Sequence, residues 1–476
     1  MKKIILLLVL AVVAITSVWT YTAYRSGALQ KAVVTDVSKN LAQEKGGLQV
    51  NLIQEILGFT EPKYYLLLFL NNTELRPGGG FIGSYGVIKI DKGMPEILKT
   101  DGTEFLDYSS NDAILPEPPQ PLKDYLSVKK WYLRDSNWSP DFKLSSEHSL
   151  DLYKKEGGIE ADKISGVIGF TPTIIAELLK FTGPVKVGTL ELNDKNFLEQ
   201  VQYQVEYGYG EQGLPRRERK DILGDLAKVV LDKVKIDFIL HWSKYYDLWQ
   251  KMVTQKQIMM YATDPSLQTA FADAKWSGEM RPSAGDYLLW VDANLGALKT
   301  DWILKRDLSY NIRPATSGQF IATAKMHYEH EGSFDWRTTR YRTYARVYVP
   351  AGSKLIKAVG AMKTDRSTVP GTVDQGVENG RQWFGAFIAI EPGKIGELTF
   401  EYYLPPSVVD QIKNGDYSLL VQKQLGTVAT NLTLNQDFGR EVTAAWPCEG
   451  ADKHGDTHYD KKMDLTMDNE FEIKLK

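Results

Sequence analysis

A glycine-rich turn contains the residues best suited to bind phosphate. Positions 71–80 read NNTELRPGGG, so Gly78, Gly79 and Gly80 follow one another directly. Consecutive glycines leave backbone N–H groups accessible and let an oxyanion approach closely. Arg76 adds a guanidinium group whose planar fork of donors matches a phosphate. The turn therefore predicts phosphate binding, although glycines in an isolated turn often only connect two strands. No lysine of the Walker type follows, which excludes a nucleotide-hydrolysing P-loop.

A second candidate site is the basic segment 215–220, which reads PRRERK. Arg216 and Arg219 are three residues apart, so on a helix they face the same side and can clamp a diphosphate. The alternative is a solvated helical face, which is the commoner role of a surface charge run. A third polar segment, 134–141, has enough hydrogen-bonding groups either to line a pocket or to form a capped turn.

Patterns typical of metal sites and nucleophiles are weak. Cys448 is the only cysteine, so the chain has no intrachain disulfide. His327 and His330 lie in a predicted strand region, and His454 and His458 lie in a polar tail. Catalytic zinc normally needs three protein ligands, which neither pair supplies. No Gly-x-Ser-x-Gly motif is present, so the sequence favours neither a zinc enzyme nor a serine hydrolase of that class.

The N-terminus predicts a membrane anchor. Positions 4–24 contain no charged side chain, and a helix of this length crosses a hydrocarbon layer of about 30 Å. Lys2 and Lys3 precede the apolar run, and positive charge there is normally held on the cytoplasmic side. We expect residues 1–24 to form a single plasma-membrane span and 25–62 to form a juxtamembrane helix or stalk, with the bulk of the chain extracytoplasmic. The alternative is a cleaved signal peptide, whose apolar core is usually shorter.

Residues 63–300 show the pattern of an α/β domain. Positions 64–70 (YYLLLFL) form a short continuous apolar run, typical of a strand buried on both faces, and 81–90 is its predicted partner. Positions 165–170 predict another core strand, and Thr171-Pro172 starts a helix that Gly183-Pro184 ends. Positions 185–190 return as strand, and 193–261 is mostly helical by periodicity. We expect a mixed sheet with covering helices.

After Leu298 the chain changes to alternating strands with turn signals. The regular spacing of these short strands predicts a β-sandwich over 305–476 with a polar C-terminal tail. The expected strands are 320–328, 344–349, 384–390, 398–403 and 417–422.

Composition limits the partners. The chain has 476 residues, 43% of them hydrophobic and 25% charged, and its net charge is −3. Such a chain can bury a substantial core, and its charge balance gives no reason to expect nucleic acid as a partner. No pattern in the sequence predicts an oligomeric state.

Four segments carry a resemblance to a known family. The runs YYLLLFLNNTELRPGGGFIGSYGVIKIDKG, NWSPDF, SGVIGFTPTIIAELLKFTGPVKV and DYLLWVDANLGALKTDW occur in order, and together they resemble domain of unknown function 4012 over most of 60–405. The outline is more distantly similar to the LytR-CpsA-Psr proteins. Those are membrane-anchored bacterial enzymes that move glycopolymers from a polyprenyl-diphosphate carrier to the cell wall.

The distant resemblance implies roles for particular residues. It places Arg76 at the arginine of that family's Arg-Ser-Asp-Thr motif, and it matches Arg216 and Arg219 with the Arg-x-x-Arg-Gln diphosphate clamp. Asp101 takes the position of a catalytic carboxylate that holds Mg²⁺. Pro77-Gly78 replaces the Ser-Asp pair that supplies a metal-binding carboxylate, and Thr100 stands where an arginine normally precedes Asp101.

The sequence therefore predicts a membrane-anchored cell-envelope protein that acts on, or only binds, a polyprenyl-diphosphate-linked glycan or cell-wall polymer. In the enzyme reading, Arg76, Gly78–Gly80, Arg216 and Arg219 bind the diphosphate, and Asp101 serves as metal ligand or base. The alternative is a non-catalytic surface scaffold or adhesion protein that displays the β-sandwich. The three cases differ in whether the arginines and Asp101 converge in one pocket.

Overall fold

The computed structural model describes residues 55–476 apart from 93, 429 and 450–454. The predicted anchor, 1–24, and the predicted stalk up to residue 54 lie outside the described residues. Among the helices that are described, none is both long and apolar enough to cross a membrane. The described chain contains several mixed sheets together with helices, which confirms the predicted mixed α/β class.

The first sheet has five strands in the order β3–β2–β1–β4–β7. β1 pairs antiparallel with β2 and parallel with β4, so the two predicted strands at 64–70 and 81–90 are confirmed as partners. Leu66, Leu68 and Leu70 alternate along β1 and are fully buried on one face of the sheet. The strands are β1 (Lys63–Asn71), β2 (Phe81–Asp91), β3 (Met94–Gly102), β4 (Ile164–Phe170) and β7 (Ile258–Ala262).

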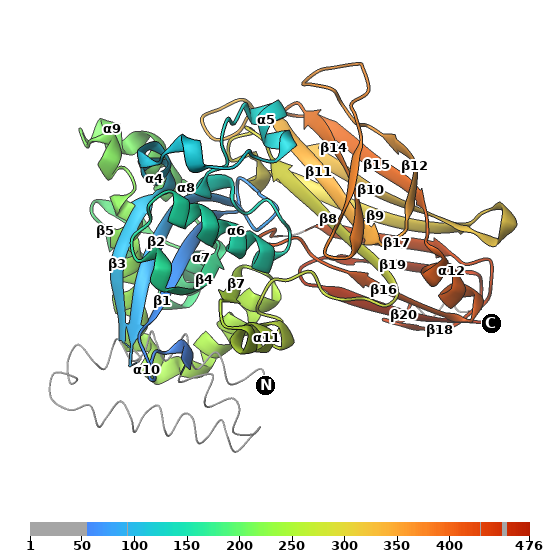
Figure 1. Ribbon diagram of the computed structural model, residues 1–476, viewed down its shortest axis with the longest axis horizontal. Coiled ribbons are helices and arrows are strands. Elements are labelled where there is room, and N and C mark those ends of the chain that lie inside the picture. Colours follow the sequence, from blue (N-terminus) through green and yellow to red (C-terminus); the bar gives the residue numbers. More distant parts are fainter. Residues whose placement is uncertain (1–54, 93, 429, 450–454) are drawn as a thin grey trace.

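Helices cover both faces of this sheet. One face packs with residues of α4 and α6, and the other packs with residues of α7, α8, α10 and α11. Figure 1 shows these helices around the blue strands. The helices of this part are α4 (Thr103–Ser109), α5 (Gln120–Leu126), α6 (Phe142–Lys155), α7 (Thr173–Thr182), α8 (Phe197–Tyr203), α9 (Tyr209–Glu211), α10 (Asp221–Thr254) and α11 (Pro265–Asp273), with a π-helical turn η4 (Gln204–Gly208) between α8 and α9.

Two local predictions need correction. The range 193–261 was predicted to be mostly helical, but Ile258–Ala262 at its end is strand β7, which pairs antiparallel with β4. Its five apolar residues are all buried, and a run this short cannot be assigned to helix or strand by periodicity. The predicted strand at 185–190 divides into β5 (Val185–Val187) and β6 (Leu190–Leu192), which form a small separate hairpin.

Two larger sheets pack face to face in the second part of the chain. Their strand orders are β12–β15–β10–β9–β17–β19 and β13–β14–β11–β8–β16–β20–β18. Both contribute to a single core, in which Tyr310 and Phe400 from the first sheet meet Val347 and Phe384 from the second. The strands are β8 (Asp286–Asn294), β9 (Leu304–Pro314), β10 (Phe320–His330), β11 (Tyr341–Pro350), β12 (Lys354–Val359), β13 (Asp374–Glu378), β14 (Arg381–Ile390), β15 (Ile395–Tyr403), β16 (Asp416–Val421), β17 (Asn431–Asp437), β18 (Val442–Trp446), β19 (His458–Asp464) and β20 (Asn469–Leu475), and α12 (Pro406–Lys413) lies between β15 and β16.

The sandwich begins before the boundary that the sequence predicted. β8 lies within the range 63–300 assigned to the first domain, yet it pairs with β11 and β16 at the centre of the seven-stranded sheet. All nine residues of β8 are buried. The turn-rich change of composition that we used appears only after β8, because this strand is apolar on both faces and resembles a strand of the α/β domain.

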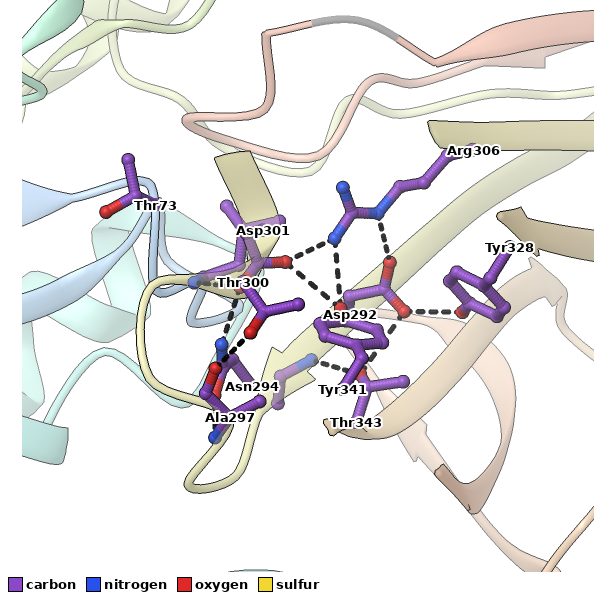
Figure 2. Close-up of polar contacts among 12 residues, drawn as sticks. Thr73, Asp292, Asn294, Ala297, Thr300, Asp301, Arg306, Tyr328, Tyr341 and Thr343 are labelled. Atoms are coloured by element: carbon purple, nitrogen blue, oxygen red, sulfur yellow. Dashed lines mark hydrogen bonds and ion pairs between the residues drawn. The ribbon is translucent and has the colours of Figure 1, made fainter. Parts of the chain in front are cut away.

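The glycine-rich turn joins the two parts. Leu75 N donates to Asp301 Oδ2 at 2.9 Å, and Asn294 N donates to Leu75 O at 2.9 Å. Figure 2 shows that Asp301 also belongs to a buried network in which Arg306 pairs with both Asp301 and Asp292. Hydrogen bonds to buried groups at the end of β8 and just after it therefore fix the turn to the sandwich.

Candidate functional site

A cavity of about 260 Å³ opens between the first sheet and the helices α7, α8 and α10. Most of its wall is apolar, and its charged groups Glu206, Arg219, Lys220 and Lys299 gather where η4, the 219–220 segment and the loop after β8 meet. The apolar lining includes Phe69, Phe81, Phe170, Ile175, Phe197, Leu198, Val201, Val205, Leu223 and Leu226, and the polar lining includes Asn71, Glu74, Ser84, Gln202, Glu206, Arg219, Lys220 and Lys299.

The apolar wall follows from the pattern of β1. Phe69 lies on the face of β1 opposite to Leu68 and Leu70, and it remains half-buried while they are fully buried. It is the register partner of Phe170 at the end of β4, and the two rings meet edge to face at 4.9 Å. Two aromatic rings at the ends of adjacent parallel strands therefore form the floor of the cavity.

The polar end of the cavity holds three cationic side chains between two glutamates. Arg219 Nη2 donates to Glu104 Oε1 at 2.6 Å, and Lys220 forms an ion pair with the other oxygen of Glu104. Glu206 lies 3.5 Å from Arg219 Nη1 and 3.0 Å from Lys299 Nζ. These carboxylates hold the cations in place next to the apolar wall.

The pKa shifts of this group reflect burial and pairing. Burial lowers the pKa of Lys220 and outweighs the opposing attraction of Glu104. Burial alone would raise the pKa of Glu104, but Lys220 and Arg219 together lower it. Burial raises the pKa of Glu74 against the attraction of Arg76 and Lys299.

One donor at this end is unused. Arg219 Nε is buried and has no hydrogen-bond partner among the described residues. A buried donor without a partner costs free energy, because it has lost its hydrogen bond to water. An acceptor that enters the cavity at this end would remove that cost.

The structure brings one of the predicted site residues to the cavity and places the others elsewhere. Arg76 is 3% exposed, and its Nε donates to Asp135 Oδ1 at 3.1 Å. Its guanidinium lies over the ring of Phe81, on which it stacks at 5.1 Å from the centroid. Arg76 is therefore used at the junction of the two parts and does not line the cavity.

Gly78, Gly79 and Gly80 face protein groups. Gly78 N donates to Asn137 O at 2.9 Å, and Gly80 O accepts from Asn137 Nδ2 at 2.7 Å. Gly79 O approaches Gly426 so closely that a Cβ on Gly426 would lie 1.9 Å from it. The absence of side chains in this turn serves a close contact between two backbones.

Asp101 and Arg216 lie apart from the cavity. Asp101 Oδ2 is 3.3 Å from Lys99 Nζ, and Asp101 Oδ1 accepts from Gly102 N at 2.8 Å. Arg216 is exposed on a short 3₁₀ turn. In the described part of the chain there is no group of three His, Cys, Asp or Glu residues that could hold a metal ion. The single carboxylate of Asp101, already beside a lysine, does not fit Mg²⁺, which prefers several oxygen ligands.

Sequence reasoning missed the residues that complete the polar end. Glu104 and Glu206 lie in α4 and η4, and Lys299 comes from the loop after β8, 93 residues along the chain from Glu206. Glu206 could have been found from the sequence, because it lies in the helical segment just before the basic segment 215–220. No local pattern marks Lys299, because only the packing of the sandwich on the α/β part brings it there.

Comparisons with known proteins agree with part of the resemblance. Residues 60–205 match the profile of the family described as "Protein of unknown function (DUF4012)", a shorter range than the 60–405 we expected. No curated protein sequence matches the chain. The more distant resemblance to LytR-CpsA-Psr proteins stays a prediction.

Solved structures show only weak likeness. A candidate nutrient binding protein from Legionella pneumophila is 6% identical with a TM-score of 0.24, over 40% of this chain and 71% of that one. An M1 zinc metallopeptidase from Deinococcus radiodurans is 10% identical with a TM-score of 0.19, over 36% of this chain and 42% of the peptidase. TM-scores this low carry no argument about fold or function.

Proposed function

We propose a function from the cavity that residues 60–205 help to line, because the family description that this segment matches, "Protein of unknown function (DUF4012)", assigns no activity. The protein binds an amphiphile with an isoprenoid tail and a phosphate or diphosphate head. The observation that supports this is one cavity with an apolar wall and, at one end, Arg219, Lys220 and Lys299.

The apolar wall suits a branched hydrocarbon better than a polar ligand. Each buried methylene contributes about 0.8 kcal/mol, and Phe69, Phe170 and Phe197 offer ring faces to methyl branches. The volume of about 260 Å³ is slightly below the range of about 300–1,000 Å³ that is usual for small-molecule pockets. We therefore expect the cavity to take the part of the tail next to the head, and the rest of a long tail to lie outside.

The polar end suits a diphosphate. Arg219 has a buried Nε without a partner among the described residues, and the ammonium groups of Lys220 and Lys299 line the same cavity. Hydrogen bonds between ionised partners are about twice as strong as neutral ones, and an apolar surrounding screens them little. Glu104 competes with the ligand for Arg219 and Lys220, so the ligand must carry enough charge to share them.

Within the same proposal we keep the wider prediction from the sequence. The chain is anchored by residues 1–24 in the plasma membrane, its bulk is extracytoplasmic, and the α/β part is similar in plan to the LytR-CpsA-Psr fold. The lipid would be the polyprenyl-diphosphate carrier of a cell-envelope glycan. Binding without turnover needs no metal and no general base, and so it fits the position of Asp101 beside Lys99.

Calorimetric titration of the full chain in detergent micelles with farnesyl diphosphate tests the proposal. Arg219→Met and Lys220→Met should each weaken binding by about ten- to a hundred-fold, because each removes a charge-assisted hydrogen bond that contributes roughly 1.5–3 kcal/mol. Arg216→Met is the matched control, since it removes an equal charge from an exposed turn outside the cavity lining. Its affinity should stay within about two-fold of the wild type.

Two further arms of this titration separate tail, head and metal. Isopentenyl diphosphate has the same head with a five-carbon tail and should bind at least tenfold more weakly than farnesyl diphosphate, because it buries fewer methylenes. Added Mg²⁺ should leave the affinity unchanged. A gain with Mg²⁺ that Asp101→Asn abolishes would favour the transferase reading, whereas no binding of farnesyl diphosphate by the wild type would refute the proposal.

A further inference from the structure

Four aromatic side chains form a partly exposed surface beside the polar end of the cavity. We define the aromatic patch as Tyr203, Tyr207, Trp302 and Trp336. Tyr203, Tyr207 and Trp302 are 37%, 48% and 50% exposed. Trp336 is half-buried. Exposed aromatic residues that gather at one place usually mark a binding surface.

Three of the four rings of the patch contact one another. Tyr203 and Tyr207 lie one helical turn apart and stack with their centroids at 5.9 Å. Trp336, from the loop between β10 and β11, meets both rings edge to face at 5.5 and 5.8 Å. A helix of the α/β part and a loop of the sandwich thus build one aromatic surface together.

The patch is continuous with the cavity. Gln202 lines the cavity next to Tyr203 in the chain, and its Oε1 accepts from Arg337 Nε at 2.8 Å. The Arg337 guanidinium in turn lies over the ring of Trp302, 4.2 Å from its centroid. A group attached to a ligand head at Arg219 and Lys299 would therefore emerge toward these rings.

We infer that the aromatic patch binds a saccharide, the one linked through the diphosphate to the lipid. This inference rests on the proposed function, because the cavity supplies the lipid end of the same ligand. A pyranose ring presents a face of C–H groups that packs against an aromatic ring, and its edge carries hydroxyl groups that need polar partners. The patch offers both kinds of group.

Carboxylates lie close to the patch and to the cations beside it. Tyr203 Oη donates to Glu211 Oε1 at 2.6 Å, which leaves the other carboxylate oxygen and the phenol lone pairs as acceptors for hydroxyl groups. Glu199 lies 4.0 Å from Arg337 Nη1, and Glu206 lies 3.0 Å from Lys299 Nζ. Carboxylates beside aromatic rings are suited to bind the hydroxyls of a neutral sugar.

The same carboxylates disfavour the main alternative, insertion of the rings into a bilayer. Membrane surfaces with anionic lipids attract basic residues, which normally accompany membrane-binding aromatic rings. Here Glu211 bonds to Tyr203, Glu199 lies beside Arg337, and the basic Arg337 is itself buried beneath Trp302. The patch therefore fits a saccharide better than a lipid surface.

The test compares two ligands that differ only in the sugar. The full chain in micelles is titrated with farnesyl diphosphate and with farnesyl diphosphate that carries N-acetylglucosamine on its terminal phosphate. The wild type should bind the sugar-bearing ligand about tenfold more tightly, which is the contribution expected from one aromatic contact with a partly buried ring. Trp336→Ala and, independently, Trp302→Ala should each reduce this gain and leave the affinity for farnesyl diphosphate unchanged.

Phe334→Ala is the matched control, because Phe334 is 61% exposed on the same loop as Trp336 but is not part of the patch. It should retain the tenfold gain. If the wild type binds both ligands equally, the patch is not a saccharide site, although the proposed function stands. If the wild type binds neither ligand, the proposed function itself fails. Patch variants that weaken both ligands alike, or that lose binding to vesicles of anionic phospholipid, would assign the rings another role and overturn the inference.

Discussion

Single residues in this protein show that charge alone does not identify a binding group. Arg76 and Arg219 have the same side chain and both were predicted to bind a diphosphate. Arg76 pairs with Asp135 and donates to a backbone carbonyl at the junction of the two parts, so it is not available to a ligand. Arg219 keeps a buried Nε without a partner among the described residues and lines the cavity. The sequence reveals the donor, and only packing reveals whether the donor is already used.

Lys423 is the buried cation with the clearest consequence for stability. Burial lowers the pKa of Lys423 to about 7, with a further lowering from the nearby charge of Lys256 and a smaller opposing effect of Asp468. Its Nζ donates to Gln255 O at 3.0 Å and to Gln424 O at 3.2 Å, so carbonyl dipoles partly stabilise the charge. A group whose pKa is lower in the folded protein than in the unfolded chain stabilises the fold more as the pH rises.

We therefore predict a pH-dependent difference between the wild type and Lys423→Met. From about pH 7 to the unfolded value of 10.5, the unfolded chain holds a proton that the folded protein has released, so the wild type gains stability with pH. Between pH 7.5 and 9.5 the gain over Lys423→Met should reach about 2 kcal/mol, at up to about 1.4 kcal/mol per pH unit. Urea unfolding at each pH measures it, and the exposed Lys462→Met should follow the wild-type profile. A constant difference between wild type and Lys423→Met would contradict the shift.

At the scale of elements, patterns with a strong period were predictable and short buried ones were not. The strands β1, β2 and β4 and the helix α7 follow from apolar runs with clear ends, and the structure confirms them. β7 and β8 are also apolar runs, but we predicted β7 as the end of a helical range and placed β8 in the α/β domain. Their sheet is decided by long-range pairing, β7 with β4 and β8 with β11, and no local signal carries that information.

The glycine-rich turn shows the same limit at a functional candidate. Glycines at 78–80 are compatible with a phosphate cradle and with close backbone contact, and the sequence cannot distinguish the two. The partner that decides between them is Gly426, which lies about 350 positions away in the loop after β16. Gly426 N donates to Lys256 O at 2.9 Å, and Gly426 O accepts from Asn72 Nδ2 at 3.0 Å.

We predict that Gly426→Ala destabilises the protein strongly. Its φ of +74° is unfavourable for alanine, and the added Cβ would lie 1.9 Å from Gly79 O, so the turn and the loop must separate. The expected loss is about 3 kcal/mol or more, the sum of about 1–2 kcal/mol for the backbone conformation and a similar amount for overpacking. Gly393→Ala is the control, because Gly393 has a φ of +69° but no atom within 4 Å of an added Cβ. It should lose only the backbone contribution. Equal losses in urea unfolding would show that the contact with Gly79 is unimportant.

At the scale of the whole molecule, the two parts share buried polar groups rather than a flexible linker. The turn 72–80 is hydrogen-bonded to Asn294 and Asp301 of the sandwich, and the 422–427 loop of the sandwich is hydrogen-bonded to the α/β part. Figure 1 shows the two parts side by side. Residues 304–314, directly after the predicted boundary between 300 and 305, form strand β9 inside the six-stranded sheet. The junction also positions Lys299 at the cavity, so a variant that disrupts the junction should also weaken ligand binding.

The last prediction is that the two parts unfold together and that Asp301 couples them. Asp301 is fully buried; its Oδ2 accepts from Leu75 N in the α/β part, and its Oδ1 binds Arg306 and Tyr341 in the sandwich. Differential scanning calorimetry of the wild type should show one transition, with equal calorimetric and van 't Hoff enthalpies.

Asp301→Ala should remove about 3–5 kcal/mol, because it leaves Arg306 with one buried carboxylate instead of two and Leu75 N without its hydrogen bond to this side chain. It should also divide the transition in two, since the turn 72–80 loses its strongest link to the sandwich. Asp416→Ala is the matched control: Asp416 pairs with Lys474 where both side chains are exposed, so its loss should change stability by less than about 1 kcal/mol. A wild type that already melts in two separate steps would mean that the parts are independent, and the cavity could then form without the sandwich except for Lys299.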